Sequence, residues 1–375
     1  MAVTHSWEAA FAERTRTGAG DGIAAILGLV ANPDLISFAG GFPDPRTFPI
    51  SRVAELVGEL DPSAFQYAPT NGLEGTRDAV GARLDRRPED GELMITSGGI
   101  EALELVAKSF LDRDDDVVVE APTYLGAIMA FRSFEANVHA LPQESLADAP
   151  VRPKLLYTIP DHQNPSGLTM PLEQREALVE RARRDGFLIV EDVAYRELAF
   201  DGAVLPSLWS LAPDVVVQAG TTSKTFFPGV RLGWAAGPRE VVAQLVSAKQ
   251  NTDQCASALA QRLFEQYVRR GWIDEQLAAS RELYARKCAR LLDALAASMP
   301  ETVRWTSPRG GFFSWLTVPD DAGELARRAV ELGVAIVPGA PFFPDGRGTT
   351  NARLSFSMVD ESLIDAGIER LAALL

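Results

Sequence analysis

Cysteine and histidine are scarce in this chain, which narrows the chemistry open to it. The 375 residues include two cysteines, Cys255 and Cys288, and three histidines, His5, His139 and His162. Two isolated cysteines make no disulfide framework and have no metal-like spacing. The scattered histidines offer no ligand cluster for zinc. We therefore expect neither a disulfide-stabilised protein nor a metal site.

Long apolar runs and an excess of positive charge are also absent. No apolar run approaches the 18 residues of a membrane span, and the N-terminus lacks the apolar core of a signal peptide. Lys and Arg number 36 against 51 Asp and Glu, a net charge of -15 that opposes binding to nucleic acid. Hydrophobic residues make up 46% and charged residues 23%, as in ordinary globular proteins. We expect a soluble, cytoplasmic protein with neither a nucleic-acid nor a membrane partner.

The chain does contain a long alternation of helical patterns with short apolar strands. The alternation runs from about residue 75 to about residue 245 and predicts an α/β fold with a mostly parallel sheet covered by helices. The strands expected within it are 93–95, 117–119, 138–141, 155–158, 188–190 and 215–218.

Different patterns flank this central region. Apolar residues recur at helical spacing over 7–31 and again over 255–297. Near the end of the chain, 312–316 and 353–357 are expected to be strands on either side of a helix at 322–332. These segments predict a smaller α+β domain, completed by the N-terminal segment.

A lysine follows the strand expected near 214–218, in a turn rich in hydroxyl groups. It is Lys224 in Thr-Thr-Ser-Lys-Thr, and Arg231 stands seven positions later. Free lysine has a pKa of about 10.4, so a nucleophilic lysine must be desolvated or lie near other cations. This turn suits an amine that forms a Schiff base beside a bound phosphate. The alternative is an ordinary exposed lysine on a loop.

Three further segments lie just past the ends of expected strands, where open α/β sheets bind ligands. They are Thr-Ser-Gly-Gly at 96–99, Asn-Pro-Ser-Gly at 164–167 and Glu-Asp-Val-Ala-Tyr at 191–195. Gly98 and Gly99 open a helix whose N-terminal N–H groups and positive dipole end favour an anion. A plain strand-to-helix turn would use the same residues. With Arg231 nearby, however, the segment predicts a phosphate site.

Several side chains in or near these segments suit an aromatic cofactor and its substrate. Asp192 ends an apolar strand, so its carboxylate needs a partner. It either caps a helix or pairs with a protonated ring nitrogen. Tyr195 and Asn164 would hydrogen-bond a ring oxygen, and Tyr124 would stack on the ring or pack in the core. Arg353 would clamp an α-carboxylate bidentately, with a surface ion pair as the alternative.

Taken together, these segments resemble the class I/II pyridoxal-phosphate aminotransferases of fold type I. The resemblance is closest to the branch that includes the 2-aminoadipate and kynurenine aminotransferases, and it covers nearly the full length. It is carried by SFAGGFPDPRTFP from Ser37, YAPTNGLEGTRDA from Tyr67, APTY ending at Tyr124, PDHQNPSG ending at Gly167, EDVAY ending at Tyr195, TTSKTFFPGVRLGW ending at Trp234, and NARLSFS ending at Ser357.

The resemblance implies a fold, a reaction and a cofactor. The fold is a large cofactor-binding domain at 50–270, with a mostly parallel seven-stranded sheet between helices, plus a small domain formed by 1–49 and 271–375. The cofactor is pyridoxal 5'-phosphate, and the reaction moves an amino group between an L-α-amino acid and a 2-oxo acid. A homodimer with shared active sites is implied as well.

The resemblance also assigns roles to single residues. Lys224 matches the lysine that forms the Schiff base and later shuttles the substrate proton. Predicted cofactor-binding residues are Gly98, Gly99, Ile100, Tyr124, Asn164, Asp192, Tyr195, Thr221, Ser223, Lys224, Arg231 and, from the other subunit, Tyr67. Predicted substrate-binding residues are Arg353, Asn164 and Gly40.

Departures from the family pattern bear on the substrate. Relatives commonly carry Gly-Ser-Gln-Gln where 98–101 reads Gly-Gly-Ile-Glu, so this segment offers the phosphate only backbone donors. Thr221 replaces a serine and keeps its hydroxyl. Some relatives read a distal substrate carboxylate with an arginine on the N-terminal helix, where 21–24 reads Asp-Gly-Ile-Ala. We therefore expect neutral, aromatic or aliphatic side chains rather than 2-aminoadipate. His162 is unusual, and the sequence does not explain it.

Two other functions use the same residues. The constellation also supports a cyclase, an oxidase or an eliminase of a secondary-metabolism amino acid, because pocket shape decides the outcome. The domain also occurs fused to DNA-binding modules in bacterial regulators. We expect no such regulator here, because the motif at Ser37 leaves too little room for a winged-helix domain and the acidic charge opposes DNA binding.

Overall fold

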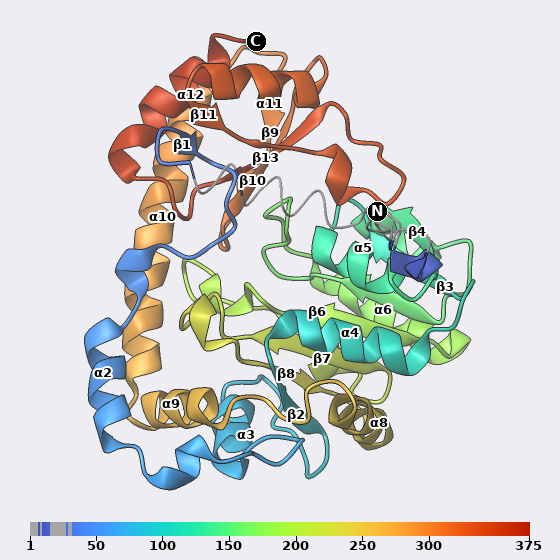
Figure 1. Ribbon diagram of the computed structural model, residues 1–375. Coiled ribbons are helices and arrows are strands. Elements are labelled where there is room, and N and C mark those ends of the chain that lie inside the picture. Colours follow the sequence, from blue (N-terminus) through green and yellow to red (C-terminus); the bar gives the residue numbers. More distant parts are fainter. Residues whose placement is uncertain (1–6, 8–9, 16–27, 29–31) are drawn as a thin grey trace, which may run out of the picture.

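The computed structural model describes residues 7, 10–15, 28 and 32–375 (Figure 1). Most of the helix predicted at 7–31 lies outside these residues, and so does the segment 21–24. Within the described part, 3₁₀ turns occur at Glu13–Thr15, Pro45–Thr47 and Pro62–Phe65. None of the described helices is both long and apolar enough to cross a membrane.

A seven-stranded sheet forms the centre of the molecule, in the order β2-β8-β7-β6-β5-β3-β4. Its strands are β2 (Leu93–Thr96), β3 (Asp116–Glu120), β4 (Asn137–Leu141), β5 (Leu155–Thr158), β6 (Leu188–Asp192), β7 (Val216–Thr221) and β8 (Gly233–Ala236). Only β8 pairs antiparallel with its neighbours β2 and β7. The mostly parallel sheet is confirmed. The position of β8 was not predicted, because four small or apolar residues give little periodic signal.

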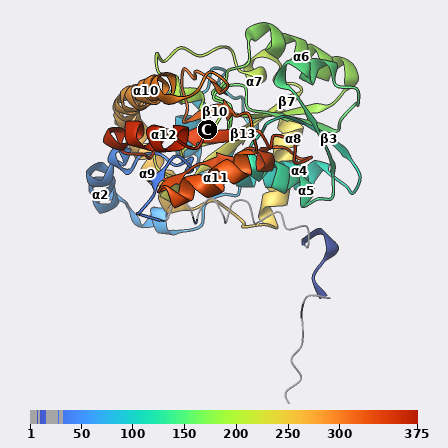
Figure 2. The ribbon, with the colours of Figure 1, turned by 90° about the horizontal axis from the view of Figure 1, so that it is seen from above.

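Helices cover both faces of this sheet, which explains why its strands are mostly apolar. Val118 of β3 belongs to one core, and its neighbours Val117 and Val119 belong to the other, as the alternation along a strand requires. Figure 2 shows α6 and α7 on one side of the sheet and α4, α5 and α8 on the other. Their bounds are α4 (Gly99–Phe110), α5 (Leu125–Arg132), α6 (Leu172–Asp185), α7 (Leu208–Leu211) and α8 (Arg239–Gln250).

A second, antiparallel sheet lies in the C-terminal part of the chain, in the order β12-β13-β10-β9. Its strands are β9 (Arg304–Trp305), β10 (Phe313–Thr317), β12 (Val337–Pro338) and β13 (Asn351–Ser355). A separate parallel pair joins β1 (Ile36–Ser37) to β11 (Val334–Ala335). The helices α11 (Ala322–Glu331) and α12 (Ile364–Ala372) complete this region. The N-terminal segment thus packs with the end of the chain.

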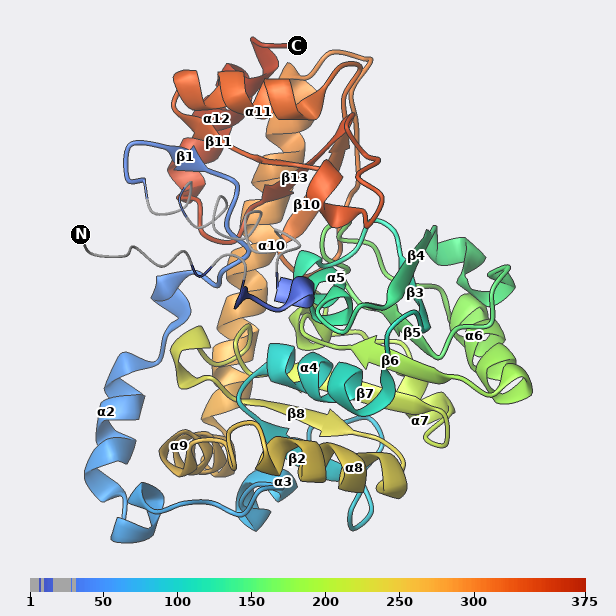
Figure 3. The ribbon, with the colours of Figure 1, turned by 45° about the vertical axis from the view of Figure 1, so that its right-hand side comes forward.

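The helix α10 (Trp272–Ser298) links the two regions (Figure 3). At 27 residues it reaches from α9 (Ala258–Arg269) to α12. The single helical pattern predicted over 255–297 is in fact two helices, separated at Gly271, whose φ is +72°. The remaining helices are α2 (Ile50–Glu59) and α3 (Glu74–Gly81). The division into domains at 50–270 and at 1–49 with 271–375 stays a prediction; it assigns each sheet wholly to one domain.

Candidate active site

Lys224 lies just beyond the carboxyl end of β7, at the edge of the sheet where β5 and β6 also end. Its Nζ donates a hydrogen bond to the carbonyl oxygen of Gly41 at 2.8 Å. The ring centres of Tyr195 and Phe312 lie 5.9 Å and 6.0 Å from Nζ. The lysine is therefore enclosed by the N-terminal loop and by two aromatic rings, rather than exposed on a loop.

The surroundings of Lys224 favour its neutral amine. Burial is the main cause that lowers the pKa of Lys224, which falls to about 8. The positive charges of Arg353 and Arg231 act in the same direction, and the negative charge of Asp192 opposes them. A lysine with this pKa is neutral in a useful fraction of molecules near neutral pH, as a nucleophile or base requires.

Asp192 ends β6 with both carboxylate oxygens already in hydrogen bonds. Oδ2 accepts from the hydroxyl of Tyr157 at 2.9 Å, and Oδ1 accepts from the backbone N–H of Ala194 at 3.0 Å. Burial raises the pKa of the Asp192 carboxyl, against these bonds and the charge of Lys224. Tyr157 was missed in the sequence, although a tyrosine in a buried strand signals that its hydroxyl needs a partner.

Arg353 is a buried guanidinium whose hydrogen-bond partners are neutral. Its Nη1 donates to Asn164 Oδ1 at 2.9 Å and its Nη2 to the carbonyl of Ala39 at 2.7 Å. Within the described part of the chain, its Nε has no partner. The rings of Phe313 and Phe342 lie 4.4 Å and 4.9 Å from Cζ. Burial lowers the pKa of Arg353 to about 10, because a charge without a counter-charge is disfavoured in the interior. An anionic ligand would supply that counter-charge.

A cluster of donors lies beside the start of α4. Ser223 Oγ accepts from Nη1 of Arg231 at 3.2 Å and from Oγ1 of Thr221 at 2.9 Å. Gly98 has a φ of +99°, and a Cβ there would lie 2.4 Å from Nη2 of Arg231. Only glycine allows the guanidinium to approach this turn so closely.

The N-terminus of α4 adds backbone donors to this cluster. Gly99 begins the helix, and a Cβ at this position would lie 3.4 Å from Cβ of Thr221. Ile100 follows in the first turn with 38% of its side chain exposed. The first N–H groups of a helix have no intrahelical partner, so they are available to an anion.

Tyr124 and Tyr195 border the same space. Tyr124 lies so close to Gly126 that a Cβ there would be 2.4 Å from its Cζ. Tyr195 packs edge-on against Phe312 and Phe313, with ring centres 5.5 Å and 5.6 Å apart. Burial raises the pKa of both tyrosines, so their hydroxyls remain protonated donors.

Gly40 and Tyr67 lie apart from these contacts. Gly40 is buried, and its carbonyl accepts from Ser357 Oγ at 3.3 Å; the next glycine, Gly41, is the one that contacts Lys224. The sequence did not single out Gly41, whose segment is held by the pairing of β1 with β11 and by bonds from Arg353 and Ser357. Tyr67 is 77% exposed at the surface.

His162 has a packing role. Its φ is +50°, and its ring lies against Gly310, where a Cβ would be 2.4 Å from Cε1. Burial lowers the pKa of His162 to about 4, so the imidazole is neutral. It supports the turn that leads into Phe312 and Phe313, two rings of the site.

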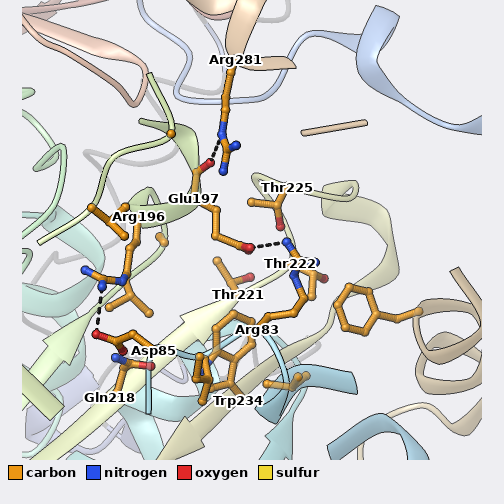
Figure 4. A pocket seen from close by; sticks show the side chains of 17 residues that line it. Arg83, Asp85, Arg196, Glu197, Gln218, Thr221, Thr222, Thr225, Trp234 and Arg281 are labelled. Atoms are coloured by element: carbon orange, nitrogen blue, oxygen red, sulfur yellow. Dashed lines mark hydrogen bonds and ion pairs between the residues drawn. The ribbon is translucent and has the colours of Figure 1, made fainter. Parts of the chain in front are cut away.

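A cavity of about 220 Å³ is lined by residues on either side of Lys224 in the chain (Figure 4). Thr221, Thr222 and Thr225 line it together with Trp234 and Arg281. Neither Asp192 nor Lys224 is among its lining residues. The cavity is therefore separate from the cluster that surrounds the lysine.

Residues 34–371 match the family model for aminotransferase class I and II. The chain belongs to this family. It is a transferase that acts on amino acids, and pyridoxal 5'-phosphate is its cofactor. The predicted recognition, fold, reaction class and cofactor are thereby confirmed. The comparisons give no support to a cyclase, an oxidase or an eliminase.

Individual relatives extend this result. A 2-aminoadipate transaminase from Thermus thermophilus is 39% identical over 99% of this chain and 97% of its own. Aromatic-amino-acid aminotransferase 1 from Thermococcus litoralis is 35% identical over 99% and 95%. The structure of an α-aminoadipate aminotransferase from Thermus thermophilus, complexed with N-(5'-phosphopyridoxyl)-L-leucine, has a TM-score of 0.91. It is 38% identical and covers 98% of both chains.

The residues of the site fit this cofactor. A phosphate dianion suits the guanidinium of Arg231, the nearby hydroxyls and the start of α4. A buried carboxylate, Asp192, suits a protonated ring nitrogen, and Lys224 is an amine of lowered pKa. No group of the described residues accepts from the Nε of Arg353, which leaves this donor for the substrate.

Proposed function

We propose that this aminotransferase holds pyridoxal phosphate at Lys224 and acts on L-α-amino acids with neutral side chains, aromatic or aliphatic. The observation that carries the proposal is the presence, in one site, of a lysine of lowered pKa and a buried arginine whose hydrogen-bond partners among the described residues are both neutral. The lysine suits amine chemistry, and the arginine suits the α-carboxylate that every α-amino acid carries.

The cofactor, when bound, supplies an electron sink for the negative charge that develops at the substrate Cα. In our proposal Asp192 keeps a proton on the ring nitrogen, and Tyr157 holds Asp192 in place. Tyr195 and Asn164 hydrogen-bond the ring oxygen, and Tyr124 stacks on the ring. The phosphate is held by Thr221, Ser223, Arg231 and the backbone of Gly98, Gly99 and Ile100.

Lys224 moves the proton in this scheme. With the cofactor bound, its neutral Nζ would take the proton from the substrate Cα and hold it for the later return step. The lowered pKa supports this role, because a base that is already protonated accepts nothing. Arg353 holds the α-carboxylate, together with Asn164, so that Cα faces the lysine.

Aromatic surroundings support a neutral side chain on the substrate. Phe313 and Phe342 flank Arg353, and Trp315 packs against Phe342 with ring centres 5.6 Å apart. One relative is named for aromatic amino acids, and another was solved with a leucine adduct. Relatives are also named for aminoadipate, so an acidic substrate is the alternative that a test must exclude.

A homodimer with shared sites is part of the proposal. Tyr67 is 77% exposed and Phe65 is 69% exposed, although both are large and partly apolar. We infer that a second copy covers this segment and that Tyr67 reaches the partner's phosphate site.

We also propose a cytoplasmic location, because Cys255 and Cys288 are both free thiols, the form that a reducing compartment maintains. Fractionation of the source cells would check this.

Borohydride reduction of the loaded protein, followed by peptide mapping, tests the central assignment. We expect the label on Lys224 and none in Lys224→Ala. A label on another lysine would overturn the proposal. A panel of amino acids then tests the substrate class, measured as conversion to the amine form of the cofactor. Faster conversion by 2-aminoadipate than by leucine or phenylalanine would contradict the predicted preference.

A further inference from the structure

A compact ionic cluster lies behind the turn between β2 and α4. The Nζ of Lys249 donates to both oxygens of Glu101, at 2.8 and 2.7 Å, and to both oxygens of Asp253, at 2.7 and 2.8 Å. Lys249 lies at the end of α8, and Glu101 lies in the first turn of α4. The cluster thus joins two helices directly behind the proposed phosphate site.

Burial makes this cluster sensitive to charge. The Lys249 side chain is 0% exposed and that of Glu101 is 10% exposed, whereas that of Asp253 is 30% exposed. One ammonium therefore serves two carboxylates, and the one at the helix start is the more buried. Charges that are removed from water interact strongly and are poorly screened by salt. Removal of Lys249 would leave the buried carboxylate of Glu101 without its cation, which is costly.

Both carboxylates hold Ser97, the residue before the two glycines. The backbone N–H of Ser97 donates to Glu101 Oε2 at 2.5 Å, and its hydroxyl donates to Asp253 Oδ2 at 2.7 Å. Its carbonyl accepts from Nη2 of Arg231 at 3.4 Å. All three polar groups of Ser97 are therefore fixed, which sets where the N–H groups of the next residues point.

Glu101 presents an electrostatic problem for a phosphate at this helix start. A helix N-terminus attracts anions, and a carboxylate in its first turn competes with the ligand for the same N–H groups and dipole. A carboxylate close to a phosphate dianion also repels it. The two short contacts of the Lys249 ammonium with the Glu101 carboxylate offset that charge.

We propose that Lys249 is a positioning residue for the cofactor phosphate. It neutralises Glu101 and, through Glu101 and Asp253, it fixes Ser97 so that the start of α4 binds the phosphate. This inference rests on the phosphate site of the proposed function. Without the inference, the cluster would be a plain structural tie between α4 and α8, which would affect stability but not the recognition of phosphate.

The experiment compares four proteins prepared without cofactor: the wild type, Lys249→Met, Glu101→Gln and the double variant. Dissociation constants are measured for pyridoxal phosphate, for pyridoxal and for inorganic phosphate. We expect K249M to bind pyridoxal phosphate at least about tenfold more weakly and to bind pyridoxal unchanged. The double variant should return to within about threefold of the wild type, because the unpaired buried carboxylate is gone.

Matched variants separate recognition from stability. Lys108→Met removes an exposed lysine that also joins α4 to the end of α8, through Ala248 and Thr252, but that does not touch Glu101. We expect K108M to bind all three ligands as the wild type does. Should K249M fail to fold, E101Q alone decides the matter. It keeps Lys249 paired with Asp253 and should bind inorganic phosphate at least as tightly as the wild type.

The inference is overturned if K249M binds pyridoxal phosphate like the wild type, or loses pyridoxal binding to the same degree. It is also overturned if E101Q binds phosphate about tenfold more weakly. These results are distinct from a failure of the proposed function. Borohydride label absent from Lys224 would refute the function itself, whereas label at Lys224 with an unaffected K249M would refute this inference alone.

Discussion

Arg353 shows how a single side chain prepares a site for its ligand. Its guanidinium is buried, yet the two groups that accept its hydrogen bonds are an amide and a carbonyl, and both are neutral. A buried cation without a counter-charge is costly, and the cost is recovered when an anion arrives. The residue is thus poised for a carboxylate before any substrate is present.

Replacement of Arg353 should therefore harm substrate binding more than cofactor binding. We expect Arg353→Met to lower kcat/KM for amino acids roughly 10²- to 10³-fold, because about two charge-assisted hydrogen bonds are lost. The visible absorption of the bound cofactor should be retained. Arg353→Lys keeps the positive charge but lacks the two parallel N–H donors of the guanidinium. Its kcat/KM should therefore lie between those of the wild type and R353M. Steady-state kinetics measure the effect; an unchanged kcat/KM in R353M would remove the clamp assignment.

Lys224 gives a prediction for pH dependence. Only the neutral amine attacks an aldehyde. When pyridoxal phosphate is added to the cofactor-free protein and trapped with borohydride, the rate of labelling at Lys224 should rise as the pH passes through about 8. Asp192 raises the pKa of Lys224, so Asp192→Asn should move the profile to lower pH. Arg353 lowers it, so Arg353→Met should move the profile to higher pH. Initial rates of borohydride-trapped labelling, measured as a function of pH, would show both shifts. A shift of the pH profile in the same direction in both variants would contradict the argument.

The sequence predicted the charged residues of the site because each carries its chemistry in its own side chain. Asp192 ends β6, Lys224 follows the end of β7 and Arg353 lies within β13, so each belongs to a segment whose pattern was recognisable in the sequence. Tyr157 and Gly41 escaped prediction for different reasons. Tyr157 lies inside a buried strand and resembles a core residue, and Gly41 contributes only a carbonyl, whose position depends on the tertiary fold.

The turn between β2 and α4 is the element on which the proposed phosphate site depends. Gly98 precedes α4 with a φ of +99°, and Arg231 lies directly against it. A backbone conformation that favours glycine and a close steric contact thus coincide at one position. Neither could be read from the sequence, where Gly-Gly before a helix suits many turns.

Replacement of Gly98 tests this element. Gly98→Ala should destabilise the protein by about 1–3 kcal/mol through its backbone conformation, and it should also displace Arg231. We expect weaker binding of pyridoxal phosphate as well as a lower Tm. Gly271→Ala is the matched control, since Gly271 has a φ of +72° and a Cβ there would meet nothing within 4 Å. It should lower stability by about 1 kcal/mol and leave cofactor affinity unchanged. Equal cofactor affinity in G98A and the wild type would argue against the close contact.

Among the helices and strands, sequence patterns predicted where the strands lie in the chain better than which strands pair with one another. Six strands of the large sheet were expected close to their observed bounds, because strands buried on both faces contain runs of apolar residues. The strand predicted at 353–357 begins earlier, at Asn351, and ends at Ser355. Its start is set by pairing with Thr317, and beyond its end Ser357 bonds to the N-terminal loop. Such long-range pairing leaves no mark in local composition.

The proposed dimer yields a prediction for the whole molecule. If Tyr67 serves the partner's site, a mixture of Lys224→Ala with a Tyr67→Ala variant of weakened cofactor affinity should regain activity. Each mixed dimer then contains one site with both residues intact. The measurement is activity at limiting pyridoxal phosphate after the two proteins are denatured and refolded together. Recovery absent from a mixture that analytical ultracentrifugation shows to be dimeric would rule out a shared site.

The loop around Gly41 has a consequence for how the enzyme is made. Ala39 and Gly41 leave the ribosome early, yet the strand that holds their segment, β11, and the arginine that bonds Ala39 are translated near the end. Domains begin to fold while synthesis continues, so the groups for the cofactor phosphate, which lie between Ser97 and Arg231, can assemble first. The clamp for the amino acid is completed only with Arg353. We infer that a nascent chain assembles its proposed phosphate site before its proposed carboxylate clamp.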